Sequence, residues 1–210
     1  MENVITIKRR GRPRKNEKAG ADTKASLIRA GIEFLTERGF SSVGLDEITK
    51  ASDVPKGSFY HWFGSKAVFG EAVIDAYGAY FSHKLSKHFK NEELTPCQRL
   101  EEFILNARHS MAKHDFARGC LVGNLGQEIA NLPGGFRQKL VDVFQDWERQ
   151  TENLILEGIA FGEFKSDLDA RMLANLFWVG WEGAVLRAKL ERRAAPLDAF
   201  AAAFINYLKS

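Results

Sequence analysis

The chain has 210 residues, of which 45% are apolar and 27% are charged, and it contains only five prolines. This composition is typical of a globular protein with a sizeable core, and it excludes a disordered or collagen-like chain. No apolar run approaches the roughly 18 residues that a membrane-spanning helix needs. Cys97 and Cys120 are too few for a disulfide framework, and the N-terminus lacks the apolar core of a secretory signal. We therefore expect a cytoplasmic protein with reduced thiols.

The positive charge is concentrated near the N-terminus. Residues 1–70 hold 13 basic and 8 acidic residues, a net charge of +5, whereas residues 71–210 hold 17 basic and 19 acidic residues, a net charge of −2. Residues 8–15 alone contain six basic residues and no acidic one. Such an arm is typical of a segment that binds phosphate groups, and the alternative is a solvated tail without a partner.

Apolar residues recur at spacings of three and four along almost the entire chain, which predicts an all-α protein. Asp22 or Thr23 is suited to cap the first helix, and Gly39 is suited to end it. Pro55 fits the first turn of the third helix, and Ser65 fits the N-cap of a long fourth helix. The first four helices are therefore expected at about residues 23–38, 45–51, 56–62 and 66–89.

Turn residues divide the remainder of the chain into five further predicted helices, at residues 97–114, 118–131, 134–162, 168–191 and 196–209. The last of these carries an apolar stripe made of Leu197, Phe200, Ala201, Phe204, Ile205 and Leu208. Because no surface of the same chain remains for this stripe, we expect a homodimer held together by the last two helices. Phe204 and Leu208 would then lie in the contact between subunits.

Residues 45–62 have the proportions of a helix-turn-helix, with two short helices around a turn at residues 52–55. Phe59 and Phe63 lie four residues apart, so both face one side of the second helix and are expected in the core. The remaining positions face outward and carry residue types that contact phosphates or base edges: Lys56, Gly57, Ser58, Tyr60 and His61. The segment therefore predicts a recognition helix for the major groove of DNA.

Gly39-Phe40 and the run Pro-Lys-Gly-Ser-Phe-Tyr-His-Trp-Phe-Gly-Ser-Lys over residues 55–66 resemble the DNA-binding domain of TetR-family transcriptional regulators. The resemblance implies an all-α homodimer with a helix-turn-helix domain over residues 22–68 and an effector-binding and dimerisation domain over residues 69–210. It also implies that the five outward residues contact the operator and that Lys66 binds phosphate. Val43 and Gly44 depart from the family, in which many members have hydroxyl residues that cap the second helix and touch the DNA backbone.

Residues 1–21 are expected to form a basic flexible arm. Within it, the segment Arg-Gly-Arg-Pro-Arg resembles the core of an AT-hook, which implies minor-groove contacts by Arg10, Arg12 and Arg14. The alternative for the arm is a general attraction to phosphate. A protein that acts through this arm alone, as an architectural minor-groove binder, would leave the recognition helix and the large C-terminal part without a role.

Two segments of the C-terminal part, residues 118–128 and 177–190, resemble the acrylate-responsive (AcuR-like) branch of the family. They are also similar to the electrophile- and bleach-sensing (NemR-like) repressors. The resemblance implies a small effector that is an unsaturated acid, an electrophile or an oxidant. A pocket for a small acid needs hydrogen-bond donors, and the candidate donors in these segments are Asn124, Gln127, Trp178, Trp181 and Lys189.

Cys120 is the candidate for covalent chemistry. It lies near the start of a predicted helix and beside Arg118, and both features lower the pKa of a thiol. A thiolate is the form that an electrophile or hypochlorous acid attacks. Lys189 matches the lysine that works with the corresponding cysteine in the bleach-sensing branch. The alternative is that Cys120 is a small buried core residue.

Enzyme signatures are absent from the sequence, which has no Gly-x-Ser-x-Gly, His-Glu-x-x-His, P-loop or paired-cysteine metal motif. The five histidines form no ligand cluster, so neither a metal nor another cofactor is predicted. The predicted function is that of a sequence-specific transcriptional regulator, a repressor released from double-stranded operator DNA by acrylate or a related unsaturated acid. The alternative is a repressor that senses oxidants or electrophiles through modification of Cys120.

Overall fold

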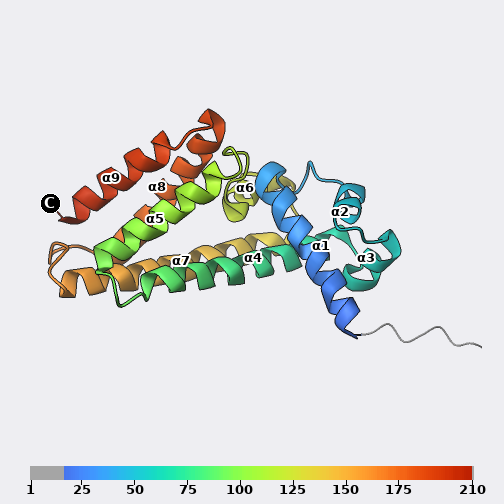
Figure 1. Cartoon of the computed structure of the whole chain (residues 1–210), viewed down its shortest axis with the longest axis horizontal. Coiled ribbons are helices and arrows are strands. Elements are labelled where there is room, and N and C mark those ends of the chain that lie inside the picture. The colour runs from blue at the N-terminus through green and yellow to red at the C-terminus, as the bar shows by residue number, and fades with distance from the viewer. Residues whose placement is uncertain (1–16, 210) are drawn as a thin grey trace, which may run out of the picture.

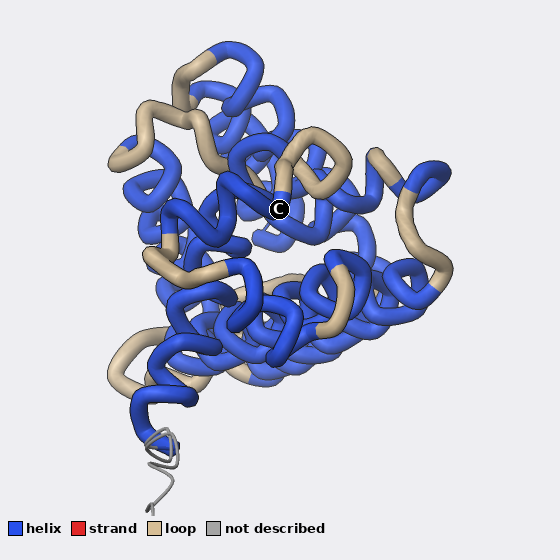
Figure 2. Tube along the Cα trace, turned by 90° about the vertical axis from the view of Figure 1, so that its right-hand side faces the viewer, coloured by secondary structure: helices blue, strands red, loops and turns tan. Residues whose placement is uncertain are grey.

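The computed structural model describes residues 17–209, which form helices and their connections (Figure 1). The predicted arm residues Arg10, Arg12 and Arg14 lie outside this range. The all-α fold class is confirmed, since Figure 2 shows no strand in the described part. Within that part, no helix combines the length and apolarity needed to cross a membrane. Its helices are α1 (Glu17–Arg38), α2 (Leu45–Ala51), α3 (Lys56–Phe63), α4 (Lys66–Phe89), α5 (Pro96–Ala112), α6 (Leu121–Gln127), the 3-10 helix η1 (Ile129–Asn131), α7 (Gly135–Ala160), α8 (Ala170–Glu191) and α9 (Ala195–Lys209).

Helices α1, α2 and α3 form a small unit at the end of the molecule opposite the C-terminus (Figure 1). Leu27, Ile48 and Phe59 are fully buried in it, and the Phe59 ring centre lies 5.1 Å from that of Phe69 in α4. The turn between α2 and α3 is tight, and Asp53 within it adopts the left-handed conformation with φ of 51°. The predicted helix-turn-helix is confirmed, and its core continues into the first turns of α4.

The long helices α4 and α7 run side by side, α5 and α8 pack against them, and α9 packs against α5 and α8 (Figure 1). Trp147 of α7 lies between Phe81 of α4 and Trp178 of α8, with ring-centre distances of 4.4 and 4.8 Å. The buried Trp178 Nε1 donates a hydrogen bond to Thr151 Oγ1 at 3.0 Å, so its burial leaves no unpaired donor. This aromatic cluster is the centre of the larger domain and fixes α8 relative to α4.

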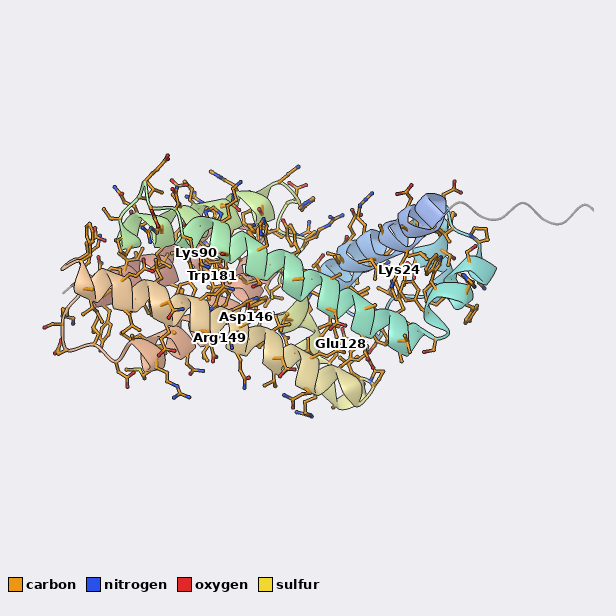
Figure 3. The ribbon with its side chains drawn as sticks, turned by 90° about the horizontal axis from the view of Figure 1, so that it is seen from below. Lys24, Lys90, Glu128, Asp146, Arg149 and Trp181 are labelled. Carbon is orange, nitrogen blue, oxygen red and sulfur yellow. The ribbon has the colours of Figure 1, made fainter. Side chains whose placement is uncertain are left out.

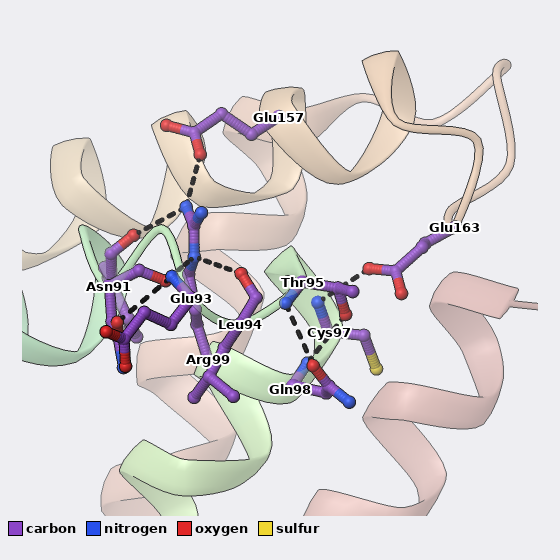
Figure 4. A network of polar contacts seen from close by, with 10 residues as sticks. Asn91, Glu93, Leu94, Thr95, Cys97, Gln98, Arg99, Glu157 and Glu163 are labelled. Atoms are coloured by element: carbon purple, nitrogen blue, oxygen red, sulfur yellow. Dashed lines mark hydrogen bonds and ion pairs between the residues drawn. The ribbon is translucent and has the colours of Figure 1, made fainter.

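A buried arginine fixes the turn between α4 and α5, at the end of the molecule remote from α1–α3 (Figure 4). Arg99 Nε donates to the carbonyl oxygens of Asn91 and Leu94 at 2.7 and 2.9 Å. Its Nη1 donates to the carbonyl oxygen of Phe89 at 3.1 Å and to Glu157 Oε2 of α7 at 2.7 Å. These bonds satisfy carbonyls at the C-terminal end of α4 and join that end to α7.

The helix predicted at residues 118–131 is wrong in its extent. Helix α6 begins only after Cys120, whose backbone is extended, and it ends before η1. The N–H of Gly119 donates to the carbonyl oxygen of Thr36 in α1 at 3.0 Å. A tertiary contact to α1 therefore holds the segment before α6 outside the helix. The predicted caps Asp22 and Thr23 are likewise inside a helix, because α1 extends back to Glu17.

The prediction that the apolar stripe of the last helix has no partner within the same chain is wrong. Phe204 and Leu208 of α9 are 5% and 0% exposed in a single subunit, because they pack between α8 and α5. Gly180 of α8 lies under the Phe200 ring, where a Cβ atom would overlap the ring, so the glycine permits this close approach. On the side of α8 that faces away from its buried residues, one stripe of apolar residues is exposed: Met172, Leu176, Val179, Leu186 and Leu190.

Candidate DNA-binding face and effector cavity

The outer face of α3 carries the residues predicted to contact DNA. Phe59 and Phe63 are buried as expected, and the helix contains no acidic residue. Lys56 Nζ forms an exposed ion pair with Asp46 Oδ1 of α2, a kind of contact that contributes little to stability and can be exchanged for a phosphate. All five positions predicted to contact DNA are exposed or partly exposed: Lys56, Gly57, Ser58, Tyr60 and His61.

Helix α2 begins without the hydroxyl cap found in many family members. Gly44 occupies the N-cap, and its N–H donates to Glu47 Oε1 at 3.1 Å. The other carboxylate oxygen of Glu47 pairs with Arg38 of α1 at 2.6 Å. Val43 is buried, so it contributes to the core of the unit. The start of α2 is therefore held through its own third residue and through α1.

Lys66, predicted to bind phosphate, is partly buried and bonded within the chain. Its Nζ donates to the carbonyl oxygen of Phe40 at 2.8 Å and lies 4.3 Å from the centre of the Phe40 ring. Glu128, directly after α6, accepts from the N–H groups of Phe40 and Ser41 at 3.1 and 2.8 Å (labelled in Figure 3). Sequence reasoning did not single out Glu128, because its partners lie 88 and 87 residues away along the chain.

A cavity of about 320 Å³ lies among the end of α1, α4, α5, the segment before α6, and α8. Cys120 and Trp181, both predicted for the effector, line it (Trp181 is labelled in Figure 3). A larger groove of about 770 Å³ opens between α7 and α8, beside the exposed Met172 on the uncovered face of α8. The cavity combines apolar walls with four basic side chains, Lys84, Lys113, His114 and Arg118.

The other residues predicted for the effector lie outside this cavity, so the structure brings together two of the six. Trp178 belongs to the aromatic cluster at the centre of the domain. Gln127 is exposed at the end of α6. Asn124 and Lys189 both bond to the main chain of α1. The last two therefore connect the larger domain to the DNA-binding unit.

Three donors of the larger domain bond to the carbonyl oxygens that end α1. Asn124 Nδ2 donates to Thr36 at 2.7 Å, Lys189 Nζ to Glu37 at 2.6 Å, and the Gly119 N–H to Thr36 at 3.0 Å. The last carbonyls of a helix lack partners in the helix and carry partial negative charge, so amide and ammonium donors are stabilising there. We call Gly119, Asn124 and Lys189 the α1 clamp. Because Thr36 also lines the cavity, the clamp joins the cavity to the DNA-binding unit.

Three weakly acidic groups, Tyr77, Cys120 and Glu182, meet at one side of the cavity, and we call them the cavity floor. Tyr77 OH donates to Cys120 Sγ at 3.9 Å. The Glu182 carboxyl contacts the same thiol and lies against Gly123, where a Cβ atom would overlap Oε2. Burial raises the pKa of Glu182 to about 7. Neither Tyr77 nor Glu182 was singled out by sequence reasoning, because their partners come from other helices.

The expectation of a lowered pKa for Cys120 is wrong. Burial raises the pKa of this thiol well above its usual value, and the neighbouring Glu182 carboxyl raises it further. Cys120 is only 9% exposed, and Arg118 is turned toward Glu33, with which it pairs at 3.4 Å. Lys189 is bonded to α1. The thiol is therefore neutral, because desolvation outweighs the effect of the short helix that follows it.

Two family models match the chain. Residues 27–73 match the one described as bacterial regulatory proteins, tetR family, and residues 96–204 match the tetracyclin repressor-like C-terminal domain. The transcriptional regulator AcuR of Cereibacter sphaeroides is 54% identical to the chain over 196 residues, covering 93% of this chain and 89% of that protein. The HTH-type transcriptional repressor NemR of Escherichia coli is 28% identical over 187 residues, covering 87% and 92%.

A solved structure shows the same architecture. The crystal structure of regulatory protein TetR from Rhodobacter sphaeroides has a TM-score of 0.86 and 53% identity, covering 88% of this chain and 98% of that one. The predicted resemblance to the AcuR-like branch, with weaker similarity to NemR, is confirmed. These relatives are regulators and not enzymes, in agreement with the motifs missing from the sequence. The chain belongs to the TetR family of transcriptional regulators.

Proposed function

We propose that the chain is a repressor that leaves its operator when a small unsaturated acid, such as acrylate, fills the cavity below α1. The position of Thr36 carries this proposal. Thr36 lines the cavity, and its carbonyl oxygen accepts hydrogen bonds from Gly119 and Asn124 of the α1 clamp. A molecule in the cavity therefore touches the residue through which the DNA-binding unit is anchored. Because its partner is chromosomal DNA, we place the protein in the cytoplasm.

On the DNA side, the outward residues of α3 are the proposed major-groove contacts: Lys56, Gly57, Ser58, Tyr60 and His61. Arg10, Arg12 and Arg14 of the arm are the proposed minor-groove contacts. We assign Lys66 a positioning role, because its bond to Phe40 ties the connection after α1 to the start of α4. The separation of roles matters for affinity, since phosphate and arm contacts are sensitive to salt whereas base contacts set sequence preference.

The family acts as dimers, and the exposed apolar stripe of α8 is the proposed contact between subunits. Five exposed large apolar side chains lie along one helix face, and a contiguous exposed apolar patch is typical of a protein–protein contact. A dimer places two α3 helices at a fixed separation, which operator half-sites about 34 Å apart require. Movement of α1 relative to the larger domain changes that separation, so an effector in the cavity weakens operator binding.

The cavity suits a small acid in size and charge. Its volume of about 320 Å³ lies at the lower end of the range for small-molecule sites. The lysine and arginine side chains around it, Lys84, Lys113 and Arg118, favour an anion, while Trp181 and Cys120 are the proposed contacts that the sequence already indicated. The resemblance of residues 118–128 and 177–190 to the acrylate-responsive branch supports the same class of effector.

Operator release measured by fluorescence anisotropy tests the proposal. The full-length chain is bound to a labelled DNA fragment that it has selected from random sequence, and acrylate is then added. We expect release by acrylate, and we expect Ala107→Phe, which fills the cavity from α5, to bind the DNA without responding. Ala112→Phe, at an exposed position of the same helix, is the matched control and should respond. Retention of the complex at every acrylate concentration would contradict the proposal.

The second candidate function is a sensor of electrophiles or oxidants, and the position of Cys120 on the cavity favours it. In this case N-ethylmaleimide or hypochlorite releases the operator, and Cys120→Ser stays bound. Intact mass then shows an adduct, or a loss of two hydrogens if Cys120 and Lys189 become joined. Reversible binding of an acid leaves the mass unchanged, so the two candidates are separated by one measurement.

A further inference from the structure

Glu182 is a partly buried carboxyl group that forms no ion pair within the described residues. It lines the cavity from α8, and its carboxyl lies against Gly123 of α6 and the Cys120 thiol. Among the ion pairs formed by residues 17–209, none includes Glu182, whereas Arg118 of the same cavity pairs with Glu33. A buried carboxylate without a partner is costly, and the group keeps its proton instead.

The groups that face Glu182 from the neighbouring elements do not replace a counter-charge. Thr36 of α1 and Tyr77 of α4 are neutral, and so is Cys120 before α6. The lysine and arginine side chains of the cavity come from α4 and from the segment between α5 and α6, and they are Lys84, Lys113 and Arg118; Tyr80 of α4 and His114 also line it. These basic groups attract an anion into the cavity, while the floor offers it neutral hydrogen-bond donors.

We propose that Glu182 recognises the carboxylate of the effector by donating a hydrogen bond from its protonated carboxyl, so that each effector binds together with one proton. This inference rests on the proposed function, and it names the residue that selects an acid. A small carboxylic acid is an anion above about pH 5 and repels an ionised carboxylate at contact distance. Two carboxyl groups that share one proton form a strong hydrogen bond instead. No bond other than this hydrogen bond is formed, and the proton comes from solvent when Glu182 is ionised.

The proposal has a direct consequence for the pH dependence of effector affinity. Only the protonated form of Glu182 is competent to bind the carboxylate, and burial holds its pKa at about 7. The apparent dissociation constant is the intrinsic constant divided by the competent fraction. That fraction falls about tenfold from pH 6 to pH 8, so the affinity for acrylate falls about tenfold over the same range.

Isothermal titration calorimetry of the full-length chain with acrylate tests the inference. Titrations at pH 6, 7 and 8 in two buffers of different ionisation heat give both the dissociation constant and the number of protons taken up. For the wild type we expect about tenfold weaker binding at pH 8 than at pH 6, with nearly one proton taken up per site at pH 8. Acrylamide has the same shape without the charge, so its binding should take up no proton.

Glu182→Gln is the diagnostic variant, because its amide donates a hydrogen bond at every pH. We expect it to bind acrylate at pH 8 as tightly as the wild type does at pH 6, with no proton uptake. Glu92→Gln, in the exposed turn after α4, removes the same charge elsewhere and should behave as the wild type. His114 lines the same cavity, so His114→Gln is included as a second control and should retain the pH dependence.

Each outcome bears on the inference. Acrylate binding by the wild type that is constant from pH 6 to 8, or a pH dependence that persists in Glu182→Gln or disappears in His114→Gln, overturns it and leaves the proposed function intact. Absence of both acrylate binding and operator release at every pH overturns the proposed function as well. If Glu182→Gln does not fold, as judged by circular dichroism, proton uptake with acrylate and its absence with acrylamide still decide the question in the wild type.

Discussion

The recognition helix and the effector cavity both present polar side chains to a ligand, but they are assembled in different ways. On α3 the functional positions fall within residues 56–61 and project into solvent. The cavity draws on α1, α4, α5, α8 and the segment before α6. At α3, therefore, a side chain can be changed without altering the fold. At the cavity, each polar group has its charge state set by neighbours from other helices, so a substitution there changes chemistry and stability together.

The largest effect is expected for substitutions in α9. If its apolar stripe is buried within the subunit, a charge there unfolds the chain, whereas a stripe at the contact between subunits would give a folded monomer. Phe204→Asp or Leu208→Asp places a charge in the contact between α8 and α9, so we expect loss of about 4 kcal/mol or more and an unfolded subunit. Val179→Asp, at a position 65% exposed, should give a folded monomer. Thermal melting and sedimentation velocity distinguish the two, and a folded Phe204→Asp monomer would contradict this assignment.

On α3 we expect loss of DNA binding without loss of structure. Tyr60→Ala and Lys56→Ala each remove an exposed side chain, and each should weaken operator binding by about 1–3 kcal/mol at an unchanged melting temperature. Removal of residues 1–15 should weaken binding less and lower its salt dependence, because it removes basic charge and leaves the major-groove contacts. Equal affinities of the full-length and shortened chains at low salt would mean that the arm makes no contact.

Glu182 in the cavity is expected to make the free energy of unfolding of the chain depend on pH. The pKa of Glu182 is about 7 in the folded chain and near 4.5 in the unfolded chain. Between these values the unfolded chain loses its proton first, so the free energy of unfolding falls as pH rises from about 4.5 to 7 and is constant above that. Glu182→Gln removes this loss and should be more stable than the wild type at pH 8, by at most about 3 kcal/mol.

Urea denaturation at pH 5 and pH 8, at one protomer concentration, measures this difference. The stabilisation by Glu182→Gln should be small at pH 5 and largest at pH 8. Glu92→Gln should show no such trend. A Glu182→Gln variant that is less stable than the wild type at both pH values would show that the carboxylate has a counter-charge in solution.

The α1 clamp is expected to matter more for communication than for stability. Asn124→Ala removes the donor to Thr36 and should cost about 1 kcal/mol of stability. Acrylate should still bind, because Asn124 does not line the cavity, but more acrylate should be needed for operator release. Calorimetry and anisotropy on the same sample separate binding from release. Asn106→Ala, at an exposed position of α5, is the control, and equal release by both variants would exclude the clamp from this role.

The smallest effect is expected at Cys120 if the effector binds reversibly. Cys120→Ser keeps a small polar group beside Tyr77 and Glu182, so the acrylate concentration needed for release should shift only a few-fold, less than about 1 kcal/mol. Complete loss of the response to acrylate would instead indicate that the thiol reacts. Unchanged responses to acids, electrophiles and oxidants alike would make Cys120 a core residue.

Local sequence signals were sufficient to predict the DNA-binding unit and most helices. The Phe59 and Phe63 spacing, Pro55 before α3 and Ser65 before α4 act within a few residues of the structure that they set. The spacing of apolar residues likewise predicted α5, α7, α8 and α9 to within about two residues at most ends. Short-range sterics and capping bonds decide these features, so one sequence was enough to predict them.

The residues and charge states of the effector cavity could be determined only from the tertiary structure. Asn124 and Lys189 were predicted as effector ligands, yet their partners in α1, Thr36 and Glu37, lie 88 and 152 residues away along the chain. A raised pKa at Cys120 follows from burial and from Glu182, neither of which a local motif specifies. The apolar stripe of α9 was visible in the sequence, but only packing showed that α8 and α5 cover it and leave the outer face of α8 exposed. Periodicity tells which side of a helix is apolar, whereas the neighbour that covers it, and the charge states that follow from burial, are set by how distant segments pack.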